Sequence, residues 1–262
     1  MPVAKKSLGQ HWLSDATALQ AICDAGEITD QDTVLEIGPG TGTLTSLLVK
    51  RAGQVIAVEF DDALASQLPN RVDASNLTVV QQDILSFDLT TLPVGYKVIA
   101  NIPYYLTSNL IRVLSESNNP ASTVVILIQK EVAQRVAARA GDMSLLSVSA
   151  QFYWDVSLGI EVPAALFTPP PKVDSQVLVL KRPNAPKFPE VEEKAFFRLV
   201  KAGFASRRKT LLNSLAGGLR TDKEQIQHIL EEAHIDPGLR AQVLSLDEWH
   251  VLYKSVTAQQ LL

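Results

Sequence analysis

The chain has 262 residues, of which 46% are hydrophobic and 20% are charged, and its net charge at pH 7 is −4. This composition is typical of a soluble globular protein and excludes a disordered or fibrous chain. No segment approaches the roughly 18 consecutive apolar residues of a membrane span, and a single cysteine with four scattered histidines indicates neither a disulfide framework nor a metal site. We therefore expect no membrane and no metal, and the polar, basic first ten residues, which lack an apolar signal segment, predict a cytoplasmic protein.

A short basic arm opens the chain. It reads Lys5-Lys6-Ser7-Leu8-Gly9-Gln10-His11-Trp12-Leu13 and is followed by Ser14-Asp15, which can cap a helix that begins near Ala18. Taken alone, this arm is best interpreted as a disordered tail with a docked Trp12.

A strand, a glycine turn and a helix follow in direct succession. The β-rich run Thr33–Ile37 precedes Gly38-Pro39-Gly40-Thr41-Gly42, and apolar residues then recur at helical spacing over residues 44–49. Such a turn can admit a cofactor against the strand end and the helix N-terminus. Thr45 occupies the position of the third glycine in a dinucleotide-binding turn, which counts against NAD.

Three more strands are predicted over residues 54–59, 77–84 and 97–100. The first ends at Glu59, about 20 residues beyond the glycines, where a carboxylate can accept both hydroxyl groups of a ribose. The alternative is that Glu59 only caps the next helix. Asp83, at the end of the following strand, could accept from an adenine amine, with Ile84 against the ring. Ligands of open α/β sheets bind at the carboxyl ends of the strands, so we expect these side chains to converge.

The segment Asn101-Ile102-Pro103-Tyr104 directly follows the strand predicted over residues 97–100. Pro103 restricts Ile102 to an extended conformation, so the Ile102 carbonyl and the Asn101 amide could present two acceptors beside the Tyr104 ring. Two acceptors and a flat aromatic surface suit a planar amine. The alternative is an ordinary turn at a strand end with an aromatic ring beneath it.

The rest of the first domain is predicted to contain a helix near Leu110, a central strand at 124–129, a helix at 131–140, and strands at 147–156 and 176–181. A rigid loop with three consecutive prolines lies between the last two strands. Phe167 in this loop could line a site or lie in the core.

Prolines at positions 183, 186 and 189 predict a linker, and the sequence beyond them has helical periodicity. We therefore divide the chain into residues 1–183, an α/β domain with a Rossmann-like sheet and helices on both faces, and residues 184–262, a small α-helical domain. The segment 194–220 contains seven Lys and Arg residues and no Asp or Glu, which indicates contacts with phosphate groups.

Five ordered motifs resemble the ribosomal RNA adenine dimethyltransferase family, which modifies two adjacent adenosines of small-subunit (16S) ribosomal RNA. The motifs are Lys6-Ser7-Leu8-Gly9-Gln10-His11-Trp12-Leu13, Glu36-Ile37-Gly38-Pro39-Gly40-Thr41-Gly42, Asn101-Ile102-Pro103-Tyr104, Phe167-Thr168-Pro169-Pro170-Pro171-Lys172-Val173-Asp174-Ser175 and Phe204-Ala205-Ser206-Arg207-Arg208-Lys209-Thr210-Leu211. The match extends over nearly the whole chain. His11-Trp12 stands where the family often has Asn-Phe.

This resemblance implies an S-adenosylmethionine-dependent methyltransferase. The residues implied for cofactor binding are Gln10, His11, Leu13, Gly38, Gly40, Gly42, Glu59, Phe60, Asp83, Ile84 and Asn101. Those implied for catalysis are Asn101, Ile102, Pro103, Tyr104 and Phe167, with the base flipped between aromatic rings. Those implied for RNA binding are Lys5, Lys6, Arg207, Arg208 and Lys209.

The implied partner is 16S ribosomal RNA in an assembling small subunit, and we expect a monomer. Three alternatives remain open: a large-subunit adenine methyltransferase of the macrolide-resistance type, a noncatalytic RNA-binding assembly factor, and a small-molecule methyltransferase. The last would leave the basic helical domain without a role.

Overall fold

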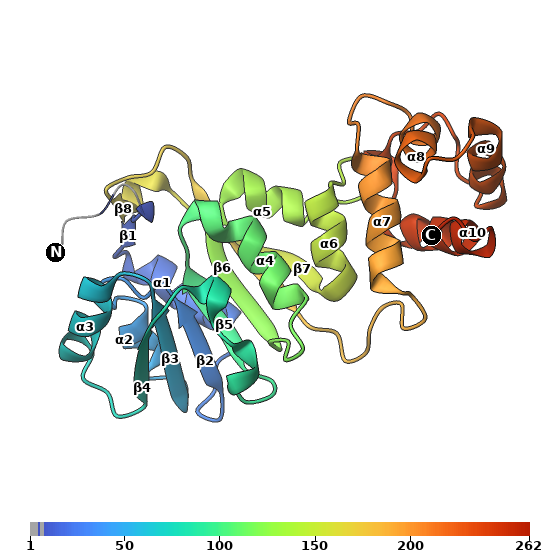
Figure 1. Ribbon diagram of the computed structural model, residues 1–262. Helices are drawn as coiled ribbons and strands as arrows, with labels where there is room; N and C mark the ends of the chain where they lie inside the picture. The colour runs from blue at the N-terminus through green and yellow to red at the C-terminus, as the bar shows by residue number, and fades with distance from the viewer. Residues whose placement is uncertain (1–4, 6–7) are drawn as a thin grey trace. The chain divides into compact units, whose positions relative to one another are not determined.

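The structure is a computed structural model that describes residue 5 and residues 8–262, so Lys6, a predicted RNA contact, lies outside the described residues. The chain forms two compact units (Figure 1). The first runs to residue 134 and includes 154–182, whereas the second consists of 135–153 and 183–262. The division that the sequence suggests after residue 183 is next to one of these boundaries, but residues 135–153 pack with the helical unit.

A seven-stranded sheet with the order β4-β3-β2-β5-β6-β9-β7 forms the first unit. Its parallel strands are β2 (Thr33–Ile37), β3 (Gln54–Glu59), β4 (Leu77–Gln81), β5 (Lys97–Asn101) and β6 (Thr123–Gln129). β9 (Ser175–Lys181) runs antiparallel to both of its neighbours, β6 and β7 (Asp155–Val162). A separate antiparallel pair joins β1 (Trp12–Leu13) to β8 (Phe167–Thr168).

Helices cover both faces of this sheet, which confirms the predicted fold class. The core that contains α1 (Ala16–Ala25) and α2 (Thr45–Leu48) also includes Val34, Val55 and Val125 of the sheet, so these helices share one face. α3 (Asp62–Arg71) packs beside them on β3 and β4. α4 (Thr107–Ser115) lies in front of β5 and β6 in Figure 1, on the other face.

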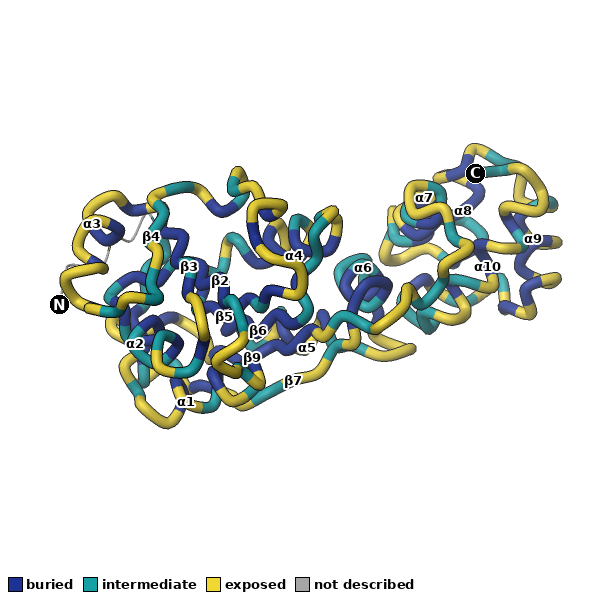
Figure 2. The backbone as a smooth tube through the Cα atoms, turned by 90° about the horizontal axis from the view of Figure 1, so that it is seen from below, coloured by how far each residue is buried: buried dark blue, intermediate teal, exposed yellow. Residues whose placement is uncertain are grey.

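Central strands are apolar along their whole length because helices cover them on both sides. In β6, the six residues from Thr123 to Ile128 are all buried, and Figure 2 shows β2, β5 and β6 largely in the buried colour. β2 lies between β3 and β5, so the chain leaves these three strands at one edge of the sheet. This arrangement brings the predicted site residues together.

The predicted strand at 147–156 is wrong, because residues Leu145–Tyr153 form helix α6. Ser144 and Ser147 begin it with reciprocal hydrogen bonds between side chains and backbone N–H groups, the pattern of a helix N-cap. Val148 and Phe152, four residues apart, lie on its buried face. The helix expected over 131–140 is also shorter, since α5 spans Lys130–Val136.

The second unit is helical, as predicted. Beside α6 it contains α7 (Glu193–Phe204), α8 (Leu211–Leu219), α9 (Lys223–Glu232) and α10 (Leu246–Ala258). Phe152 of α6 packs against Phe196 of α7, with ring centroids 4.9 Å apart, which explains why the segment 135–153 belongs to this unit. Within residues 9–262 the short 3₁₀ helices are η2 (Ile84–Ser86), η3 (Leu89–Thr91), η4 (Tyr104–Leu106), η5 (Ala164–Leu166) and η6 (Ala241–Val243).

Candidate active site

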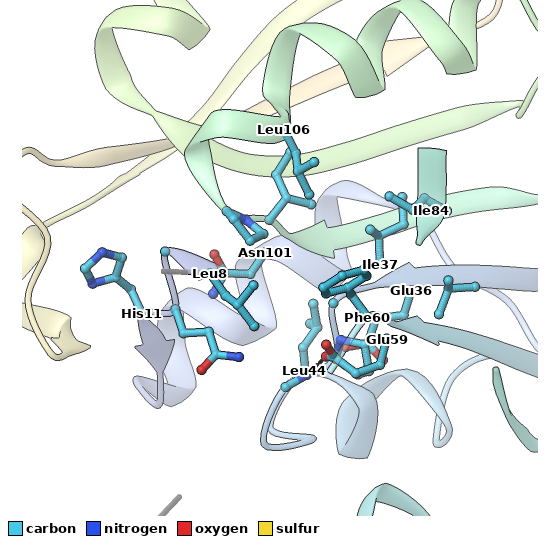
Figure 3. Close-up of a pocket in the computed structure, with 18 of the residues that line it drawn as sticks. Leu8, His11, Glu36, Ile37, Leu44, Glu59, Phe60, Ile84, Asn101 and Leu106 are labelled. Atoms are coloured by element: carbon cyan, nitrogen blue, oxygen red, sulfur yellow. Dashed lines mark hydrogen bonds between the residues drawn. The ribbon is translucent and has the colours of Figure 1, made fainter. Parts of the chain in front are cut away.

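A cavity of about 230 Å³ lies where β2, β3 and β5 end (Figure 3). Almost all of the residues predicted for cofactor binding and catalysis line it. They are Gln10, His11, Leu13, Gly38, Gly40, Glu59, Phe60, Asp83, Ile84, Asn101, Ile102, Pro103, Tyr104 and Phe167. Gly42 does not line it; a Cβ atom at this position would lie 2.8 Å from Leu68 of α3, so its contact is with the packing beneath the turn.

The glycine turn forms part of the cavity wall and leaves space for a ligand. Gly38 follows β2 with a φ of +65°, a conformation that favours glycine, and a Cβ atom built there would meet nothing within 4 Å. Its N–H donates to the Val58 carbonyl at 2.9 Å, which fixes the turn to β3. The space above Gly38 is therefore available to a ligand that approaches the backbone closely.

Glu59 is held in a fixed orientation at the end of β3. Its Oε2 accepts from the Gly40 N–H at 3.1 Å, and its Oε1 accepts from the Asp61 N–H at 2.9 Å. Burial raises the pKa of the Glu59 carboxyl. The cap of α3 is Asp61, whose Oδ1 accepts from the Ala63 N–H, so helix capping does not explain the position of Glu59.

Three further predicted residues lie next to Glu59 around the cavity. Phe60 is 57% exposed and lies close to Glu59 and Ile37 in Figure 3. Asp83 caps η2 through the Leu85 N–H at 3.0 Å, while Ile84 is buried. An exposed ring, an apolar side chain and a carboxylate together suit a planar heterocycle with an amino group.

The loop after β5 forms another part of the cavity wall. The Asn101 side chain has no hydrogen-bond partner among the described residues, so its amide oxygen is available to a ligand. The Tyr104 hydroxyl is 2.7 Å from Ser175 Oγ, which fixes the ring, and burial raises the pKa of this phenol. An available acceptor thus lies beside an anchored aromatic ring.

The amino-terminal arm from residue 8 onward is attached to the triple-proline loop. Leu13 pairs with Phe167 in the β1–β8 ladder, and His11 Nδ1 donates to the Pro169 carbonyl at 2.7 Å. The Trp12 indole lies against the turn so closely that a Cβ atom at Gly40 would be 2.5 Å from it. The arm is therefore a wall of the cavity, and the interpretation of a disordered tail does not hold for these residues.

Phe167 both lies in the core and lines the cavity, the two positions that the sequence allowed for it. It is 3% exposed and packs in the core with α1 and the sheet, yet it also lines the cavity. The His11 and Tyr104 rings are nearly parallel, with centroids 6.1 Å apart. His11, Tyr104 and Phe167 thus contribute aromatic surface to the same cavity as Asn101.

Sequence reasoning did not single out Glu36, although the residue lies within a quoted motif. It is 1% exposed, it lines the cavity, and its Oε2 has no hydrogen-bond partner among the described residues. Burial raises the pKa of this carboxyl to about 8, and the nearby Glu59 carboxylate contributes to the rise. The sequence signal for Glu36 is its place within an apolar strand that helices cover on both faces, since glutamate is seldom fully buried.

Among the residues predicted to bind RNA, Lys5 forms an ion pair with Asp61 at 2.7 Å. Arg207, Arg208 and Lys209 are exposed in the turn between α7 and α8, and none of these three has an ion-pair partner in the described part of the chain. Their charges are therefore available to an anionic partner. No cluster of His, Cys, Asp or Glu in residue 5 and residues 8–262 is placed to hold a metal ion.

The expected cofactor, S-adenosylmethionine, fits the residues that line the cavity. The open space at Gly38 allows close approach to the backbone, and the fixed Glu59 carboxylate is a suitable acceptor for the hydroxyl groups of a ribose. The unpaired Oε2 of Glu36 adds a buried acceptor. Neither carboxyl group has a basic ion-pair partner among the described residues, which suits a ligand that carries positive charge.

Comparison with known sequences agrees with this geometry. The family model described as "Ribosomal RNA adenine dimethylase" matches residues 1–257. Ribosomal RNA small subunit methyltransferase A of Dehalococcoides mccartyi is 44% identical over 95% of this chain and 87% of the relative. The protein of the same name from Alkaliphilus metalliredigens is 41% identical, over 97% of this chain and 92% of the relative.

Solved structures lead to the same group of enzymes. A dimethyladenosine transferase from Plasmodium falciparum has a TM-score of 0.84 and 26% identity, over 95% of this chain and 98% of that chain. The 23S rRNA methyltransferase ErmE has a TM-score of 0.77 and 26% identity, over 94% of this chain and 99% of that one.

These findings confirm the resemblance noted in the sequence. The protein is a methyltransferase whose cofactor is S-adenosylmethionine, and its substrate is ribosomal RNA. The chain belongs to the ribosomal RNA adenine dimethylase family.

Proposed function

We propose that this protein dimethylates the exocyclic amines of two adjacent adenosines in 16S ribosomal RNA, within an assembling small subunit in the cytoplasm. The observation that carries the proposal is that Gly38, Glu59 and Asn101 line the same cavity. The names of its relatives, which specify the small subunit, support the choice of substrate. We also propose that the protein acts as a monomer.

In this proposal the strand ends hold the cofactor. Gly38 and Gly40 provide close backbone approach, Glu59 accepts from the ribose, and Asp83 and Ile84 contact the adenine. The other proposed cofactor contacts are Gln10, His11, Leu13, Gly42, Phe60 and Asn101. When bound, S-adenosylmethionine supplies an electrophilic methyl group on a sulfonium.

The protein's own residues would position the target amine. Its lone pair is delocalised into the purine ring, so the amine is a poor nucleophile. Acceptors at Asn101 Oδ1 and the Ile102 carbonyl would bind its hydrogens and favour a pyramidal nitrogen. Pro103 holds the loop rigid, and in-line placement of this kind supplies several kcal/mol, on the order of 7 for well-oriented groups.

Aromatic rings would hold the base after it leaves its stack. Tyr104, anchored through Ser175, stacks on one face of the flipped adenine, and Phe167 closes the other. Phe167 supports this role because it lines the cavity, although most of its surface packs in the core.

We propose that the helical unit binds the RNA backbone through Arg207, Arg208 and Lys209, with Lys5 and Lys6 of the arm as further contacts. Exposure of the three basic side chains in one turn supports this role. Phosphate contacts give affinity but little sequence choice, so the choice of adenosine would come from RNA shape and from an unpaired base.

The test is incubation with labelled S-adenosylmethionine and undermethylated small or large ribosomal subunits, followed by mapping of the labelled nucleotide. We expect label on two adjacent adenosines of small-subunit RNA. The second candidate is methylation of large-subunit RNA, which the likeness to ErmE over 94% of the chain favours. Label confined to large-subunit RNA would establish that candidate instead, whereas no label on either would reject both.

A further inference from the structure

Tyr105 lies at the mouth of the cavity and has no role in the proposed mechanism. It lines the same cavity as Tyr104, but its side chain is 63% exposed. Both residues belong to η4, and successive side chains of a 3₁₀ helix point about 120° apart. Tyr104 is anchored inward through Ser175, so the next ring along the chain points towards solvent.

The Tyr105 ring lies beside Gly9 of the arm. A Cβ atom added to Gly9 would lie 3.7 Å from both Cδ1 and Cε1 of this ring, so only a glycine separates the arm backbone from it. Gly9 has a φ of +61°, which favours glycine. The ring is therefore flanked by the arm on one side and is largely accessible. Its hydroxyl has no hydrogen-bond partner among the described residues.

An aromatic ring with these properties is a stacking surface for an unpaired base. Stacking on an aromatic side chain requires one accessible ring face and accepts any base. The proposed reaction also requires such a surface, because its two target adenosines are neighbours in the RNA. While one amine lies at Asn101, the other adenosine must lie outside the cavity, one nucleotide away.

We propose that Tyr105 stacks on the unpaired purine next to the adenosine in the cavity, and that it holds the second target while the first is methylated. This inference rests on the proposed function. Its ligand is an unpaired RNA base, and Tyr105 is a positioning residue that does not touch the reacting atoms.

The first experiment compares Tyr105→Ala, Tyr105→Phe and the control Val94→Ala in methylation of undermethylated small subunits. Val94 is 95% exposed and precedes β5, so it lies at the opposite end of this strand from Asn101. Loss of one stacked base corresponds to a decrease in RNA affinity of roughly 5- to 150-fold. We expect the KM of Tyr105→Ala for subunits to rise by a factor within this range, and the share of products with only one modified adenosine to increase. The dissociation constant for S-adenosylmethionine should stay unchanged. Tyr105→Phe and Val94→Ala should behave as the wild type.

The second experiment requires no methyl transfer. An RNA hairpin with two adjacent unpaired adenosines carries fluorescent 2-aminopurine in place of one of them, and each position is replaced in turn. The wild type should quench 2-aminopurine at the waiting position on binding, whereas Tyr105→Ala should bind without this quenching. Equal quenching by both proteins, or none by the wild type, would overturn the inference.

The two experiments also separate this inference from the proposed function. If small subunits are not methylated but the quenching still depends on Tyr105, the choice of substrate is wrong and the stacking role stands. If small subunits are methylated and Tyr105→Ala has the wild-type KM and product distribution, the function stands and the stacking role is rejected.

Discussion

The buried carboxyl of Glu36 makes a quantitative prediction about stability. Replacement by glutamine keeps the size of the side chain and removes its titration. In the folded protein, burial and the neighbouring Glu59 carboxylate raise the pKa of Glu36 from its ordinary value of 4.5 to about 8. Between these two values the folded state keeps a proton on Glu36 that the unfolded state has lost.

The sign of the effect follows from proton binding. A carboxyl whose pKa is raised by folding contributes stability that is fully present below pH 4.5 and is lost as the pH rises to about 8. At about 1.36 kcal/mol per pH unit, the free energy of unfolding of the wild type should fall by about 5 kcal/mol across this window from Glu36 alone. In Glu36→Gln this contribution is absent.

Urea unfolding at several pH values between 5 and 9 measures the difference. Because other groups titrate in both proteins, the quantity to compare is the change in the free energy of unfolding between pH 5 and pH 9. We expect Glu36→Gln to lose less stability than the wild type, by several kcal/mol. The groups of neighbouring elements that face Glu36 are Glu59 of β3 and Cys23 of α1. Parallel curves for Glu36→Gln and the wild type would show that Glu36 is ionised at neutral pH and would refute the reasoning.

Three further predictions concern the turn, the loop and the helical unit. Asn101→Ala should lower the single-turnover rate about 100-fold or more, because the amine loses an acceptor that orients it. Calorimetry should find a much smaller loss in binding of S-adenosylmethionine, because Asn101 is one of many proposed cofactor contacts; an unchanged rate would remove Asn101 from the mechanism. Gly40→Ala should lower the free energy of unfolding, measured in urea, by about 1–3 kcal/mol. The reason is that φ at this position is +56° and the new Cβ would lie 2.5 Å from Trp12. A stability equal to that of the wild type would show that the arm does not pack on the turn. Arg207→Glu with Arg208→Glu should weaken binding to small subunits and reduce the slope of log affinity against log salt by about 1 to 2, with cofactor affinity unchanged; an unaltered slope would place the RNA contacts elsewhere.

The sheet could be predicted because its strands are local patterns. Thr33–Ile37 and Gln54–Glu59 are short, β-rich and bounded by turn residues, and the structure has strands over these same residues. The rule that ligands bind at the carboxyl ends of parallel strands then brought Gly38, Glu59 and Asn101 to one edge before any distance was known. Local pattern and a topological rule were sufficient for this wall of the site.

The arm and the helical residues 145–153 could not be predicted in this way. The ladder between Leu13 and Phe167 joins segments more than 150 positions apart, and nothing in either segment indicates the other. Val148 and Phe152 suit a strand or a helix equally well in a short apolar stretch. The packing of Phe152 against Phe196 and Phe197 of α7 decides the outcome.

The two carboxyl groups at the sheet edge should make the cavity prefer the charged methyl donor to its uncharged product. Glu36 and Glu59 are both buried at the cavity, and neither has a basic ion-pair partner among the described residues; Lys5 of the arm is paired with Asp61. A buried carboxylate without a counter-charge is costly, so a ligand with a positive charge is favoured there over an uncharged one of the same shape. S-adenosylmethionine carries a sulfonium charge, and the thioether that remains after methyl transfer does not. The cavity should therefore bind the methyl donor more tightly than its product. Above pH 8, where Glu36 loses its proton, this preference should be larger in the wild type than in Glu36→Gln.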